Sequence, residues 1–85
     1  MKKGYDFMPV RRLGMGSIQR YLESHGWEKS YSGMEYDQWL KVIDGKVHTF
    51  PLDVEGTEEW YMVVAEIIAK CENVPLNNVL KEIMT

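Results

Sequence analysis

The chain has 85 residues, 45% of them hydrophobic and 12% aromatic, and a formal net charge of −3 at pH 7. This length allows one domain, and the composition is typical of a folded domain rather than a disordered segment. The sequence contains no apolar run near the roughly 20 residues that a transmembrane helix needs, and we expect no secretory signal. The single cysteine, Cys71, cannot form an internal disulfide, which favours a cytoplasmic location.

The charged residues are unevenly distributed along the chain. Residues 1–20 contain five basic residues and one acidic residue, whereas residues 21–85 contain five lysines and twelve carboxylates. Pro9, Gly14 and Gly16 interrupt any early helix, so we expect residues 1–16 to form a basic, loosely ordered arm. Residues 17–85 form the predicted domain. Such an arm is typical of nucleic-acid-binding proteins, and it also suits a segment that packs on its own domain or on a partner.

The predicted elements begin with a helix over about residues 18–25, with Ser17 as its N-cap and Gly26 directly after its end. Asp44-Gly45 lies between alternating apolar residues and predicts a two-residue type I′ turn that joins two antiparallel strands. The three strands are predicted over residues 27–31, 36–43 and 46–52, the last ending near Pro51 because proline cannot donate to a central ladder.

Two further helices are predicted after the strands. Thr57 is the expected N-cap of the first, and Pro75 is expected in the first turn of the second. The stripe expected to face the core in the first of these helices consists of Trp60, Val63, Val64, Ile67, Ile68 and Cys71. The order α-β-β-β-α-α predicts an α+β fold with a three-stranded antiparallel sheet and helices packed on one face.

The turn position fixes the pairing of the two long strands and therefore the composition of each sheet face. Trp39 is predicted opposite Phe50, and Val42 opposite Val47, on different faces. Helices on one side can cover only one face, so apolar residues remain on the other. Whichever face the helices leave free, we expect it either to lie under the arm or to form a surface for self-association or a partner. Our first hypothesis takes the face around Trp39 and Phe50 as the free one. The predicted partner-binding residues are Trp39, Lys41, Ile43, His48 and Phe50.

The sequence contains no recognisable catalytic or metal-binding spacing. His25 and His48 are the only histidines, neither has a second ligand at metal spacing, and Cys71 is expected to be a core residue. We therefore expect no metal, no cofactor and no catalytic residue. The alternative is residual RNA cleavage in which His48, beside Lys41, acts as the general base.

The stretch from Tyr21 to Lys29, together with the order of elements, resembles the small HicA-like domains of bacterial toxin–antitoxin systems. The resemblance covers about residues 17–71 and implies a fold like that of double-stranded-RNA-binding domains. In that family the second strand begins with a Gly-Ser-His element whose histidine cleaves RNA. Residues 32–36 occupy this place here and contain no histidine, so the resemblance implies a domain without the catalytic motif. Residues 65–83 resemble the tail of small bacterial and phage proteins.

These observations predict a non-catalytic protein-interaction module, which could form a homodimer or bind a protein partner. A phage-encoded inhibitor in a defence, counter-defence or toxin–antitoxin setting would be one instance. The alternative is a nucleic-acid-binding domain, with or without RNA cleavage. Its predicted binding residues are Arg11, Arg12, Arg20 and Lys41.

Overall fold

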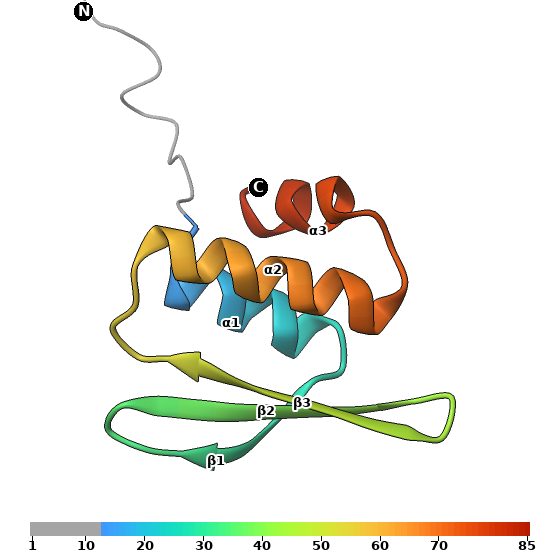
Figure 1. The fold of residues 1–85 in the computed structure, drawn as a ribbon, viewed down its shortest axis with the longest axis horizontal. Coiled ribbons are helices and arrows are strands. Elements are labelled where there is room, and N and C mark those ends of the chain that lie inside the picture. The colour runs from blue at the N-terminus through green and yellow to red at the C-terminus, as the bar shows by residue number, and fades with distance from the viewer. Residues whose placement is uncertain (1–12) are drawn as a thin grey trace, which may run out of the picture.

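The computed structural model describes residues 13–85. Its elements are α1 (Met15–Ser24), β1 (Glu28–Ser32), β2 (Tyr36–Ile43), β3 (Lys46–Asp53), α2 (Glu58–Glu72) and α3 (Leu76–Ile83). The predicted α+β order is confirmed. Figure 1 shows the helices gathered on one side of the sheet. Among the described residues, no helix lies on the opposite side of the sheet.

The sheet has the strand order β1-β2-β3, and both pairs of neighbouring strands are antiparallel. Asp44 and Gly45 have φ angles of 52° and 79°, so both residues of the β2–β3 turn take the left-handed conformation that a type I′ turn requires. The predicted pairs of Trp39 with Phe50 and Val42 with Val47 are both present. The turn therefore sets the register that decides which side chains share a face.

The sequence predicts that the third strand ends near Pro51. In the structure Pro51 instead pairs with Gln38 inside β3. The physical reason is that β3 lies at the edge of the sheet. An edge strand has alternate N–H groups that face away from its neighbour, and proline fits at such a position without breaking the ladder.

The first helix begins earlier than predicted. Gly14 is the N-cap, and Ser17 lies within α1, where its hydroxyl accepts a hydrogen bond from the Gly14 backbone N–H at 3.1 Å. Ser17 is therefore the residue that reaches back to the cap, not the cap itself. Leu13 is buried in the core, so the folded domain includes residues 13–16. Residues 1–12 of the predicted arm, including Arg11 and Arg12, lie outside the described residues.

The core lies between the sheet and the helices. Thr57 caps α2 as predicted, accepting a hydrogen bond from the Trp60 backbone N–H at 3.1 Å. The buried face of α2 differs from the predicted stripe, because it is turned toward Tyr61 and Ala65 and leaves Val63 exposed. Pro75 is the N-cap of α3 and not a residue of its first turn. The third helix packs against both α2 and α1.

Candidate functional site

Trp39 and Phe50 lie on the covered face of the sheet, which corrects the expectation that this face is free. Their side chains are 1% and 3% exposed and belong to the hydrophobic core beneath the helices. The ring of Phe50 packs edge-on against that of Trp27, with centroids 5.1 Å apart. The helices cover this face because its large aromatic side chains fill the space between two layers. Neither residue can contact a partner without unfolding.

The other predicted partner-binding residues share this helix-facing side. Lys41 is already engaged: its Nζ lies 2.5 Å from the carbonyl oxygen of His25, at the C-terminal end of α1, and 3.7 Å from a carboxylate oxygen of Glu72. A lysine at this place satisfies a carbonyl that the helix leaves unpaired. Ile43 and His48 are half-buried on the part of the hairpin next to the β2–β3 turn.

The uncovered face of the sheet carries an apolar surface. We define the outer sheet surface as the exposed or half-buried residues Tyr31, Tyr36, Leu40, Val42, Val47 and Pro51. Val42 and Val47 are cross-strand neighbours, 56% and 62% exposed. At the other end of the strands, the rings of Tyr31 and Tyr36 lie 5.4 Å apart.

Polar side chains connect the two ends of the outer sheet surface. Gln38 lies between the tyrosines and Leu40, and its amide nitrogen donates to the Thr49 hydroxyl at 2.8 Å. Met34, 96% exposed, extends the apolar area onto the β1–β2 loop. Aliphatic and tyrosine side chains in one exposed area are characteristic of protein-binding surfaces, where tyrosine gives a large contact area at a low entropic cost.

The outer sheet surface is bordered by negative charge. Glu28 is paired with Leu40 and Asp53 with Tyr36, so both carboxylates belong to the uncovered side. None of the outward-facing positions in the three described strands is a lysine or an arginine. Lys29, the only basic residue of β1, faces the helices, where its Nζ lies 3.5 Å from a carboxylate oxygen of buried Asp37.

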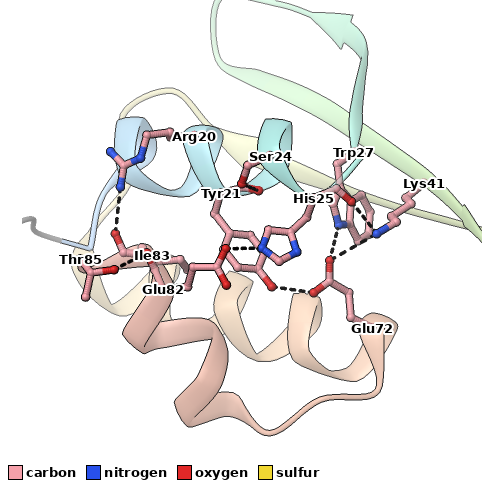
Figure 2. Close-up of polar contacts among 10 residues, drawn as sticks. All are labelled: Arg20, Tyr21, Ser24, His25, Trp27, Lys41, Glu72, Glu82, Ile83 and Thr85. Carbon is pink, nitrogen blue, oxygen red and sulfur yellow. Dashed lines mark hydrogen bonds and ion pairs between the residues drawn. The ribbon is translucent and has the colours of Figure 1, made fainter.

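A second notable feature is a polar cluster on the helix side, centred on Glu72 at the end of α2 (Figure 2). The Glu72 side chain is 9% exposed. It accepts hydrogen bonds from the Tyr21 hydroxyl at 2.6 Å and from the indole Nε1 of Trp27 at 2.8 Å. Together with Lys41, these donors compensate a carboxylate that would otherwise be costly to bury.

The Glu72 cluster continues through His25 to α3. The His25 ring stacks on that of Tyr21, with centroids 3.9 Å apart, and its Nε2 contacts the carboxylate of Glu82. Burial raises the pKa of the Tyr21 hydroxyl well above its usual value, and its hydrogen bond to Glu72 and the charges of Glu72 and Glu82 raise it further. Tyr21 therefore remains a neutral hydrogen-bond donor throughout the ordinary pH range.

The arrangement of the Glu72 cluster accounts for how the helices are held together. Its members come from α1, α2, α3, β2 and the residues before β1, and each polar contact joins two of these segments. Glu72 already accepts two hydrogen bonds, and the Tyr21 hydroxyl is committed to it. We interpret the cluster as a structural clamp between α3 and the rest of the domain.

Glu72 is not among the residues predicted from the sequence, although the sequence contains a signal for it. Glu72 lies four residues after Ile68 and so continues the buried stripe of α2, where a carboxylate would be expected to have partners. Those partners, Tyr21 and Trp27, are 51 and 45 residues away in the chain. Only the tertiary fold identifies them.

The predicted nucleic-acid-binding residues do not form one surface in the described part of the chain. Arg20 donates to the carbonyl oxygen of Ile83 at 3.3 Å. Figure 2 shows Arg20 and Lys41 at opposite ends of the cluster.

His48 pairs with Lys41 across β2 and β3, as the register predicted. Among the described residues, the His48 side chain itself takes part in no hydrogen bond or ion pair. Residues 13–85 contain no group of three or more His, Cys, Asp or Glu side chains that could hold a metal ion. In the same residues, no helix is both long and apolar enough to cross a membrane.

No family model, no curated protein and no solved structure matches this chain.

Proposed function

We propose that this domain is a non-catalytic protein-interaction module that binds a protein partner through the outer sheet surface. The observation that carries the proposal is the exposure of Val42 and Val47 side by side on a face that none of the described elements covers. A contiguous exposed apolar area on a small domain is commonly a binding surface.

Charge supports a protein partner over a nucleic acid. Residues 13–85 contain twelve acidic and six basic side chains, and the outward-facing carboxylates Glu28 and Asp53 border the outer sheet surface. Phosphate groups would be repelled there, because nucleic-acid affinity depends on neutralising phosphates with lysine and arginine. A partner with an apolar centre and a basic rim complements this surface.

A partner of this kind is compatible with the hypothesis, drawn from the sequence, that the domain is an inhibitor. An acidic domain that covers the basic groove of a nucleic-acid-binding protein would compete with the nucleic acid for that groove. The toxin–antitoxin or counter-defence setting implied by the HicA-like resemblance would supply such proteins. In this proposal the domain acts by occupancy and needs no catalytic residue.

The proposal is tested by affinity capture from cells in which the gene occurs, with two matched variants. Val42→Asp places a charge in the outer sheet surface, and Val63→Asp places the same charge at an exposed position of α2. We expect a protein that is recovered with the wild type and Val63→Asp but is lost with Val42→Asp. Equal recovery of every bound protein with both variants would refute a role for the outer sheet surface.

The nucleic-acid alternative is tested on the same preparations. We expect no shift of RNA or DNA mobility by the wild-type protein at about 50 mM salt, the low-salt condition under which phosphate contacts are strongest. Binding that weakens steeply with added salt would favour the alternative. Cleavage of the RNA that is abolished by His48→Ala, with the fold retained, would favour an enzyme.

A further inference from the structure

The β3 strand presents an unpaired edge whose hydrogen-bonding groups can be assigned from the pairing. The two-residue turn makes Ile43 and Lys46 the hydrogen-bonded pair that closes the hairpin, and hydrogen-bonded pairs then alternate along the ladder. The backbone groups of Val47 and Thr49 therefore face away from β2. Pro51 has the same parity, and its lack of an N–H fits an outward-facing position.

The two edges of the sheet differ in their capacity to accept another strand. The free edge of β1 belongs to a strand of five residues whose register shifts between Lys29 and Tyr31. Such an irregularity disrupts a further ladder. The β3 strand has eight residues and pairs with β2 without a register shift. Of the two, β3 has the edge that can extend the sheet.

We infer that this edge binds the β3 strand of a second copy of the chain, in antiparallel orientation, so that two sheets join into one of six strands. The pairing places Val47 opposite Thr49 of the second copy, and Thr49 opposite its Val47. Each of these pairs exchanges two backbone hydrogen bonds, and the two-fold axis passes beside His48.

Pro51 distinguishes this register from its neighbour. A pairing shifted by two residues would place Val47 opposite Pro51 of the second copy, and proline has no N–H to donate. That register adds a Thr49–Thr49 pair but leaves each Val47–Pro51 pair with one of its two hydrogen bonds, so it gains none over the first register, in which both pairs are complete. The free backbone groups of β3 are thus complementary to themselves, which is the property that an isologous interface needs.

Side chains on the uncovered face favour the same pairing. Val47 is 62% exposed and lies at the seam between the two copies, next to Val42. Joining the sheets would bring together the valine pairs of both copies on the uncovered side and reduce their contact with water. Leu40 and the tyrosines remain exposed on the enlarged face, so the dimer can still bind the partner proposed above.

The test compares two substitutions of one residue by sedimentation equilibrium of the purified protein, across micromolar to low millimolar concentrations. Val47→Pro removes the outward N–H, whereas Val47→Thr keeps it together with a β-branched side chain. We expect the wild type and Val47→Thr to form dimers of similar affinity and Val47→Pro to dimerise at least about tenfold more weakly. A wild type that stays monomeric at every concentration would overturn the inference.

Amide hydrogen exchange of the wild type gives a readout that depends on no variant. We expect the Val47 and Thr49 amides to exchange more slowly as the protein concentration rises, because they become hydrogen-bonded only in the dimer. A dimer that leaves these two amides unprotected would contradict pairing at this edge. It would leave the protein-partner proposal intact, because that proposal is tested at Val42.

Discussion

Trp39 of β2 and Phe50 of β3 are cross-strand neighbours, and both side chains are buried beneath the helices. Successive side chains of a strand point to opposite faces of the sheet. Because Trp39 and Phe50 point toward the helices, Leu40, Val42 and Val47 point to the uncovered side. The position of the candidate binding surface thus follows from the packing of two aromatic residues that do not belong to it.

We expect Trp39→Ala to lower the free energy of unfolding by about 3–5 kcal/mol, as the removal of a fully buried aromatic side chain usually does. Val42→Ala, on the same strand but exposed, should change it by less than about 1 kcal/mol. Denaturation by urea measures both variants. Similar losses of stability for the two variants would contradict the assignment of the covered face.

Glu72→Gln should lower the stability by about 1.5–3 kcal/mol, because hydrogen bonds to a charged group are stronger than those to a neutral amide. An amide also adds an N–H₂ donor beside the donors of Tyr21 and Trp27. Glu66→Gln, on an exposed turn of the same helix, is the control and should have little effect. Equal, small effects of the two substitutions would argue against the structural clamp.

The raised pKa of Tyr21 makes a prediction for alkaline solutions. The folded state favours the neutral hydroxyl, so its contribution to stability is complete below the unfolded pKa of about 10 and is lost as the pH rises toward the folded value. The stability difference between the wild type and Tyr21→Phe should therefore shrink as the pH increases above about 10. Unfolding curves over this range measure the difference, and an unchanged gap would contradict the predicted pKa shift.

Two glycines give opposite expectations for substitution by alanine. Gly45 has a φ of 79°, so Gly45→Ala should destabilise the protein by about 1–2 kcal/mol. Gly16 lies in α1, and a Cβ added there would meet no atom within 4 Å, so Gly16→Ala should stabilise the protein by about 0.5–1 kcal/mol. Thermal unfolding distinguishes the signs. Two changes of the same sign would be inconsistent with the left-handed turn or with the early start of α1.

Local signals in the sequence predicted much of this fold. Asp44-Gly45 identified the turn, and with it the pairing of both long strands, because only one register is compatible with a two-residue loop. Thr57 identified the start of α2, because threonine is a favoured N-cap residue. The start of α1 was misplaced because N-cap preference ranks Ser17 above Gly14, whereas Ser17 is here the third helical residue, whose hydroxyl reaches back to the Gly14 N–H.

The covered face could not be chosen from alternation, because both faces of the hairpin carry apolar residues. Residue size favours the observed choice: Trp39 and Phe50 offer more area to bury than Val42 and Val47. Gln38 and Thr49, which hydrogen-bond on the uncovered side, point the same way. The Glu72 cluster could not be predicted from the sequence for a different reason. Its hydrogen-bond donors come from segments far apart in the chain, which only tertiary packing brings together.

The most direct test of the proposed function is an NMR titration of the isotopically labelled domain with the captured partner. We predict that the largest changes in amide signals occur at Leu40, Val42 and the tyrosines of the outer sheet surface, while the exposed residues of α2 and α3 change little. Changes confined to the helices, with the amide signals of the sheet unaffected, would contradict the account.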